Sequence, residues 1–279
     1  IAVALILSGC SGASDSEPVP VFPGAEPPTV FTKAYSMTES LDGEVRVFAK
    51  ENGDETWLYE VHRKGRNWSE PMRMDLPARK MMMGPSFSAE DGRLYFSSDA
   101  ELPDGSERRD LNIWSVDMTP DGWGTPEPLA GDINTGANET MAAVSTQGEM
   151  VFVSNHPRLG GGGYDLAEAR RDSDGNWNMV RALDEVNDSR ATDHIALSAD
   201  GQRLFFYSHR APKHGVVDIW VTEKDANGVW GEPVNPGEPL NSTGINFGAG
   251  LSGDGKTLFF SRDGVLYEIP VTSLHLPAR

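Results

Sequence analysis

Short apolar runs, each preceded by a polar turn that contains glycine, recur along the whole chain. Five segments share this pattern: SLDGEVRVFAK from Ser40, SAEDGRLYFSSD from Ser88, STQGEMVFVSN from Ser145, SADGQRLFFYSH from Ser198 and SGDGKTLFFSRD from Ser252. Their turn glycines Gly43, Gly92, Gly148, Gly201 and Gly255 lie 49, 56, 53 and 54 residues apart. Because a near-constant period of this size is typical of stacked supersecondary units, we predict five copies of one β-hairpin unit.

A second series of residues has the same period. Segments that begin with tryptophan start at Trp68, Trp123, Trp177 and Trp230, which are 55, 54 and 53 residues apart. Between the two series each unit contains one more apolar segment: TWLYEV, LNIWSV, YDLAEA, VDIWVT and GVLYEI. Each unit therefore offers four antiparallel strands, which is the content of one β-propeller blade.

The last unit lacks a tryptophan-led strand, which the same spacing would place at about residue 283. An apolar, β-prone segment, Pro28 to Tyr35 (PTVFTKAY), precedes the first hairpin. We expect this segment to pair with the last blade, since an open array of blades would leave exposed strand edges. The predicted fold is all-β: a single five-bladed β-propeller over residues 30–279, with four-stranded antiparallel blades and an N-terminal strand that closes the last blade.

The repeated motifs resemble those of the WD-repeat-like β-propeller family of TolB type. The matching segments are PSFSAEDGRLYFSSD with DLNIWSVD, and ALSADGQRLFFYSHR with VDIWVTE. The third unit departs from the pattern, with Gln147 in place of Asp and Ala167 in place of Trp. The resemblance covers residues 35 to 270 and implies a bacterial envelope protein that binds other proteins or cell-wall material. It implies no reaction, because a fold does not fix a function.

The charge of the chain narrows the classes of partner. Its 279 residues carry 42 acidic and 24 basic side chains, for a formal net charge of -18. Such a chain repels nucleic acid phosphates and anionic lipid surfaces at long range, so a nucleic-acid partner is disfavoured.

The single cysteine, Cys10, excludes an internal disulfide framework and indicates a lipid anchor. It ends the segment LSGC, which resembles the lipobox of bacterial lipoproteins, where cleavage before the cysteine precedes attachment of a diacylglycerol. Residues 1–9 then represent the end of a signal peptide, and residues 10–29 a lipidated cysteine with a flexible tether rich in Ser, Pro and Gly. The alternative is a short buried strand with a chance cysteine. Ser11 after the cysteine resembles an outer-membrane address.

Candidate binding residues lie in the loops that the propeller would gather on one face. Loops held by a rigid scaffold are where binding usually resides. Basic side chains concentrate there in spite of the acidic composition: Arg108, Arg109, His156, Arg158, His209, Arg210, Lys213 and His214. They indicate a site for an anionic ligand or an acidic partner surface. The alternative is a set of solvated loop charges that bind nothing.

The loops between successive units share asparagines, Asn134, Asn187, Asn241 and Asn246, with Glu139, Asp193 and His194 close by. Amides and carboxylates in a ring suit sugar hydroxyls, so Asp193, His194 and Asn246 are also candidate binding residues. The alternative is a repeated turn in which asparagine bonds to the backbone.

An enzyme is the competing class, because some five-bladed propellers resemble glycoside hydrolases of the arabinanase type. Such chemistry needs two carboxyl groups that face one cleft. Glu139 and Asp193 are the candidates. We expect no cofactor, and no metal site, since His209 and His214 lack a third ligand.

The sequence therefore predicts a monomeric, lipid-anchored protein of the outer membrane, on its periplasmic or surface side. The loop face of the propeller would bind an envelope protein or peptidoglycan and related glycans without chemistry.

Overall fold

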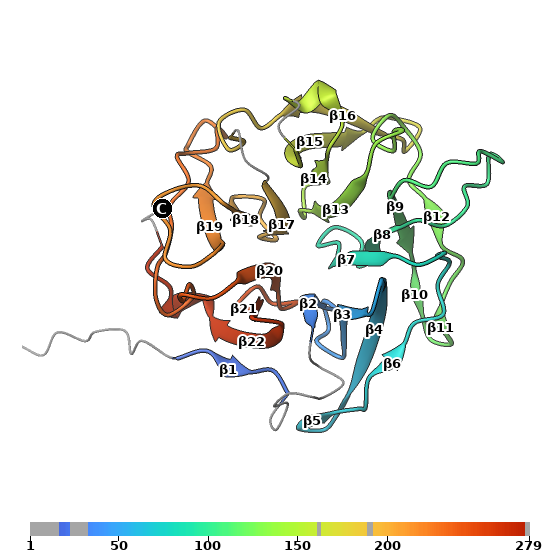
Figure 1. Cartoon of the computed structure of the whole chain (residues 1–279). Coiled ribbons are helices and arrows are strands. Elements are labelled where there is room, and N and C mark those ends of the chain that lie inside the picture. Colours follow the sequence, from blue (N-terminus) through green and yellow to red (C-terminus); the bar gives the residue numbers. More distant parts are fainter. Residues whose placement is uncertain (1–16, 23–32, 161–162, 189–191, 277–279) are drawn as a thin grey trace, which may run out of the picture.

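The computed structural model describes residues 17–22, 33–160, 163–188 and 192–276. Five antiparallel sheets radiate from a central axis (Figure 1). Their innermost strands are β2 (Ala34–Glu39), β7 (Met82–Phe87), β13 (Glu139–Val144), β17 (Thr192–Leu197) and β20 (Asn246–Leu251). Each innermost strand contacts those of both neighbouring blades, and β20 contacts β2. The ring is therefore closed, and the predicted five-bladed propeller is confirmed.

The next two strands of each blade lie where the sequence pattern predicts them. The second strands are β3 (Val45–Asn52), β8 (Leu94–Ser98), β14 (Glu149–Ser154), β18 (Arg203–Ser208) and β21 (Thr257–Arg262). The third strands are β4 (Glu55–Lys64), β9 (Asn112–Val116), β15 (Asp165–Arg171), β19 (Asp218–Glu223) and β22 (Val265–Pro270). Two short 3-10 helices, η1 (Pro157–Leu159) and η2 (Val271–Ser273), follow β14 and β22.

The recurring Ser-x-Asp-Gly turn has a direct physical cause. In the fourth blade, the Ser198 hydroxyl donates to Asp200 (2.6 Å) and accepts the backbone N–H of Arg203 (2.8 Å). Gly201 adopts φ 69°, a left-handed conformation that favours glycine. The turn therefore needs all three residue types at this spacing, and the first and fifth blades repeat it.

The outermost position of each blade is filled in different ways. The third blade has a continuous strand, β16 (Trp177–Ala182). In the first blade the outer position is shared by two short strands, β5 (Asn67–Trp68) and β6 (Met72–Arg73). In the second blade a short hairpin of β10 (Met118–Thr119) and β11 (Gly122–Trp123) is followed by a short outer strand, β12 (Glu127–Pro128). In the fourth blade Val221 and Val234 exchange backbone hydrogen bonds of 2.9 and 2.8 Å. The tryptophan-led segments thus reach the blade edge, but most are interrupted.

An N-terminal strand closes the last blade, as predicted, but it is an earlier segment than expected. β1 (Val19–Pro20) pairs antiparallel with β22, so that Val19 lies opposite Glu268. The assignment of Pro28 to Tyr35 to this role was wrong where it can be checked, because Ala34 and Tyr35 belong to β2. The remainder, residues 28–32, lies outside the described residues, as does Cys10.

Residues 19–22 of the predicted tether lie against the last blade. Val21 and Phe22 are only 5% and 7% exposed, and the N–H of Val21 donates to the carbonyl of Leu266 (3.1 Å). A proline-rich composition favours a flexible segment, yet proline is tolerated at a sheet edge, and two adjacent apolar side chains suffice to fasten it.

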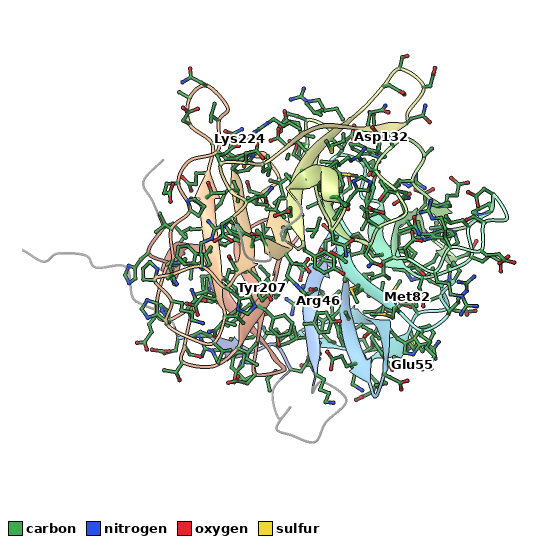
Figure 2. All side chains as sticks on the ribbon, turned by 45° about the horizontal axis from the view of Figure 1, so that its top comes forward. Arg46, Glu55, Met82, Asp132, Tyr207 and Lys224 are labelled. Atoms are coloured by element: carbon green, nitrogen blue, oxygen red, sulfur yellow. The ribbon has the colours of Figure 1, made fainter. Side chains whose placement is uncertain are left out.

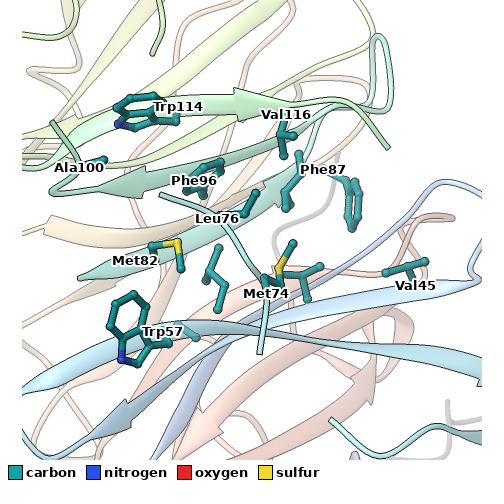
Figure 3. Packing of buried hydrophobic residues seen from close by; sticks show 14 of the residues in the cluster. Val45, Trp57, Met74, Leu76, Met82, Phe87, Phe96, Ala100, Trp114 and Val116 are labelled. Carbon is teal, nitrogen blue, oxygen red and sulfur yellow. The ribbon is translucent and has the colours of Figure 1, made fainter. Parts of the chain in front are cut away.

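The hydrophobic core is divided into five clusters, each built from two neighbouring blades. Between the first and second blades, Trp57 and Val45 belong to one buried cluster with Phe96 and Trp114 (Figure 3). At the closure of the ring, Phe22 joins a cluster from the first and fifth blades, with its ring 5.9 Å from that of Phe48. The side chains fill the spaces between the blades (Figure 2). Every blade is therefore stabilised by both neighbours.

Replacing Phe22 with alanine should weaken the closure of the ring. We expect the free energy of unfolding to fall by about 3 kcal/mol, the usual effect of removing a buried aromatic side chain. Val19→Ala is the matched control, because Val19 is 52% exposed and its loss should cost less than about 0.5 kcal/mol. Urea unfolding of the two variants measures the difference. Equal effects would show that the closing segment does not hold the last blade.

Candidate functional site

Every innermost strand contains a β-bulge, a feature that turns side chains away from the regular alternation of a strand. The pairing register shifts in β2, β7, β13, β17 and β20. In four blades a residue of positive φ lies at the bulge: Ser36 (50°), Gly84 (60°), His194 (48°) and Gly248 (68°). The bulges lie in the half of each strand that follows the interblade loop, so they surround one end of the central axis.

Aligning the blades by their paired residues places one side chain from each blade at this end. The five equivalent residues are Tyr35, Met83, Thr140, Asp193 and Phe247. Together with His194, the residue after Asp193, they form what we call the mouth ring. Asp193 is the only acidic member. The mouth ring is thus an aromatic and apolar rim with one carboxylate.

Below the mouth ring the innermost strands converge tightly. The cavity at this level is lined by small residues, Thr38, Ser86, Ala143, Ala196 and Gly250, and by larger ones such as Glu39, Phe87 and Leu251. A Cβ on Gly250 would lie 1.7 Å from the carbonyl oxygen of Met37, so only glycine fits. The cavity at this level has a volume of about 50 Å³, room for water alone. A ligand would therefore reach the mouth ring from the loop face.

Asp193 is 8% exposed and is fixed by two hydrogen bonds to one carboxylate oxygen. Oδ1 accepts from the hydroxyl of Thr140 (3.2 Å), on the neighbouring blade, and from the backbone N–H of His194 (2.7 Å). Oδ2 lies 3.7 Å from Nδ1 of His194, longer than a hydrogen bond. Among the described residues this buried Nδ1 finds no hydrogen-bond partner. The site therefore contains an unsatisfied polar atom, which is uncommon in a folded protein.

Aromatic rings enclose the imidazole of His194. The ring centroids of Tyr35, Phe247 and Tyr207 lie 5.6, 5.3 and 5.6 Å from it, and Tyr35 lies 5.4 Å from Phe247. These distances are those of aromatic pairs in favourable contact. Tyr207 comes from β18, behind the innermost strand, and its hydroxyl lies 2.9 Å from Nε2 of His209. Three blades thus contribute to one aromatic cluster.

The carboxylate of Asp193 influences the tyrosines around it. Burial, together with the negative charges of Glu51 and Asp193, raises the pKa of Tyr35 to about 12, despite a hydrogen bond with Thr56. Burial and Asp193 also raise the pKa of Tyr207. Burial is the larger cause of both shifts, and the negative charge of Asp193 adds to it because negative charge opposes ionisation of a phenol.

The basic residues of the second-blade loop differ in their contacts. Arg108 donates to Asp110 (2.8 Å), to the side-chain oxygen of Asn112 (2.6 Å) and to the carbonyl of Thr135. Arg109 is exposed. The guanidinium of Arg108 therefore holds its own loop against the following interblade loop.

The basic residues of the third blade brace η1. Nδ1 of His156 accepts the N–H of Arg158 (3.1 Å), and the Arg158 guanidinium donates to the carbonyl of Asp132 (2.8 Å). These contacts fix the loop that follows β14.

In the fourth blade, Arg210 donates to the carbonyl of Val186 and lies 3.7 Å from the carboxylate of Asp188. Its side chain is only 12% exposed, so replacing Arg210 would destabilise this blade. Lys213 donates to the carbonyl of Val216 (3.0 Å), and His214 is exposed. Binding of an anionic partner by the loop cations stays a prediction, and most of them have internal partners.

The interblade asparagines have a repeated role in the fold. Asn134, Asn187 and Asn241 each accept the N–H and donate to the carbonyl of one third-strand residue: Ile113, Leu166 and Ile219 respectively, at 2.8 to 2.9 Å. Each amide thereby replaces one residue of a fourth strand. Asn246 is fully buried and bonds to the carbonyls of Ser242 (2.9 Å) and Gly244 (3.3 Å), among others.

Glu139, the candidate acid of the competing hydrolase hypothesis, is 0% exposed. Its oxygens accept from the N–H and hydroxyl of Thr135 (2.9 and 2.7 Å) and from the hydroxyl of Ser154 (2.8 Å). Burial raises the pKa of Glu139, although these hydrogen bonds oppose the rise. The carboxyl group therefore stabilises the loop before β13.

Tyr35, Met83, Tyr207 and Phe247 were not among the predicted site residues. For Tyr35, Met83 and Phe247 the signal in the sequence is the equivalent position in each repeat, eight or nine residues before the turn glycine, where residue types differ between blades. The bulge that turns them to the mouth is visible only in the structure. Tyr207 lies six residues after its turn glycine, Gly201.

Two further classes of site are absent from the described ranges. No three His, Asp, Glu or Cys side chains gather there in a way that would hold a metal ion. No helix in the same ranges has the length and apolar character needed to cross a bilayer.

The chain resembles solved structures at low sequence identity. No family model matches it, and no curated protein matches it. The α-L-arabinofuranosidase of Lactobacillus brevis is 12% identical, with a TM-score of 0.54 and coverage of 86% of this chain and 90% of that one. A glycoside hydrolase is 9% identical, with a TM-score of 0.55 and coverage of 89% and 88%.

TolB from Acinetobacter baumannii is 15% identical over 71% of this chain, with a TM-score of 0.45. This chain spans 44% of the length of that protein. The likeness to the two glycosidase structures shows the β-propeller fold alone.

Replacing Asn241 with alanine should destabilise the fourth blade, because the N–H and carbonyl of Ile219 would lose their partners. We expect a loss of about 2 kcal/mol in the free energy of unfolding. Asn227→Ala is the control, since Asn227 lies in an exposed hairpin and its loss should cost less than about 0.5 kcal/mol. Similar denaturation midpoints for the two variants would contradict the structural role of the amide.

The pH dependence of stability should contain a contribution from Asp165, at the start of β15. Burial, and then the charges of Asp188 and Asp184, raise its pKa to about 6. The folded state therefore binds a proton that the unfolded state releases between about pH 4 and 6, so ionisation lowers stability as the pH rises through this window. The free energy of unfolding of Asp165→Asn, relative to that of the wild type, should therefore rise by about 1 kcal/mol from pH 4 to pH 7. Unfolding in urea at four pH values tests this, and a difference independent of pH would contradict it.

Proposed function

We propose that the protein is a lipid-anchored bacterial envelope protein that binds a partner at the mouth ring and performs no chemistry. The main support is the aromatic cluster around Asp193 and His194. At its centre His194 has a left-handed backbone conformation, and its Nδ1 has no hydrogen-bond partner among the described residues. Strained and unsatisfied groups persist where the fold imposes them, and they concentrate at functional sites.

The rest of the fold supports this location. Five innermost strands hold the mouth ring, and the interblade loops beside it are braced by asparagine and arginine side chains. A rigid scaffold presents binding groups with little loss of entropy. The LSGC segment with Cys10 supports the anchor, which would bring the loop face to a partner in the envelope.

A glycoside hydrolase has less support from the site. Such an enzyme needs a carboxylic acid that reaches the glycosidic oxygen, and Glu139 is sealed among Thr135 and Ser154. The solved glycosidases share the fold, which is common to many functions. We therefore place binding first.

The proposal is tested by capture of partners from envelope extracts and by sedimentation with purified peptidoglycan. A Tyr207→Ala/Phe247→Ala variant should lose at least 90% of the captured partner while Leu41→Ser retains it, and urea unfolding confirms that both variants are folded. Leu41 is the control, because it is 49% exposed in the glycine-turn region, on the opposite face. Capture that survives the mouth variant and fails in the control would place the binding surface elsewhere and overturn the proposal.

A further inference from the structure

The chemistry of the mouth ring defines the group that it accepts. Of its six residues, Tyr35, Met83 and Phe247 present aromatic or apolar surface, and Thr140 has its hydroxyl bonded to Asp193. A sugar needs several free polar groups around its hydroxyls, and this ring offers one carboxylate. The composition instead suits a group with an apolar body and one charge of the opposite sign.

The electrostatics of the site have a definite sign. Asp193 lies on an innermost strand of a protein with a net charge of -18. Burial raises the pKa of Tyr35, Tyr164 and Tyr207, and the negative charge of Asp193 adds to this rise. Arg210 donates to the carbonyl of Val186 and lies 3.7 Å from the carboxylate of Asp188. The potential in the mouth ring therefore favours cations.

Aromatic rings strengthen this preference. The ring centroids of Tyr35, Phe247 and Tyr207 lie within 5.6 Å of that of His194, and the rings of Tyr35 and Phe247 lie 5.4 Å apart. A cation over such rings gains from their quadrupoles, and a carboxylate beside them adds direct attraction. The unsatisfied Nδ1 of His194 lies on the same side as Oδ2 of Asp193, 3.7 Å away.

We propose that the mouth ring binds the cationic end of a lysine or arginine side chain from a protein partner. The inference rests on the proposed function and specifies its ligand. The charged group would lie against Asp193 and the aromatic cluster, and its methylene stem against Met83 and Phe247. This is the opposite polarity to that expected from the basic loops, most of whose cations have internal partners.

The test uses small probes that differ only in charge. N-acetyl-arginine amide and N-acetyl-lysine amide are titrated into the full-length protein, with N-acetyl-citrulline amide and N-acetyl-norleucine amide as the neutral counterparts. Side-chain NMR signals of His194 and Tyr207 report the binding. We expect saturable binding of the cationic probes, and at least tenfold weaker binding of the neutral ones.

Matched variants locate the effect. Asp193→Asn removes the charge with little change in shape and should weaken cation binding at least tenfold. Asp225→Asn makes the same change in an outer hairpin of the same blade and should leave binding unchanged. Phe247→Leu keeps the charge, removes an aromatic face, and should weaken binding about threefold to tenfold. Urea unfolding confirms that each variant is folded.

The outcomes separate the two proposals. Equal affinity for arginine and citrulline probes, or cation binding unaffected by Asp193→Asn, overturns the cationic ligand. If neither cationic probe binds while the Tyr207→Ala/Phe247→Ala variant still loses partner capture, the binding function stands and the cationic ligand falls. If peptidoglycan is the captured partner, the assignment to a protein side chain is overturned.

Discussion

The convergence of five strands on one axis is the constraint on which the rest of the structure depends. Each blade buries both faces against its neighbours, so no blade is stable without the next, and the ring must close. The strands lie so close together that a Cβ on Gly250 would meet the carbonyl of Met37. Below the mouth ring the innermost strands pack closely around the axis. The larger side chains of the mouth ring lie at the level of the bulges.

The blade junctions show how the repeat and the closure are related. The indole N–H of Trp123 donates to Glu60 of the preceding blade, and Trp230 donates to Glu168 in the same way, both at 2.9 Å. Glu60 and Glu168 occupy equivalent positions in the third strands of their blades, and each lies opposite a valine of the second strand. Trp123 and Trp230 thus each place a ring and a donor at the edge of the preceding blade.

The closure uses a related contact. Glu268 has the same position in the fifth blade, and it pairs with Arg46 at 3.2 Å. The Arg46 guanidinium lies 4.4 Å from the centre of the Trp68 ring and 2.7 Å from Glu39. The first and last blades are therefore joined by the carboxylate and tryptophan of the other junctions, with an arginine between them.

Features with a local cause were predictable from the sequence, and features that depend on the ring were not. The Ser-x-Asp-Gly turn is specified by its own residues, and its period revealed five blades. The closing strand at Val19 was missed because two paired residues leave no recognisable pattern. Loop position alone suggested Arg210 as a binding residue, whereas the carbonyl that it bonds, on Val186, is brought close only by folding. Asp193 and His194 were found by their place before an innermost strand, without their aromatic surroundings.

The mouth ring owes its character to the departure of single blades from the repeat. At the bulge, the second and fifth blades have glycine, which meets a left-handed φ without strain, but the fourth has His194. The backbone there is held by pairing on both sides of the bulge, so the fold imposes the unfavourable conformation. The adjacent Asp193 gives this one blade a charge that the other four lack at the same position. A near-symmetric scaffold thereby carries an asymmetric site, because stability depends on the positions that repeat and recognition on those that do not.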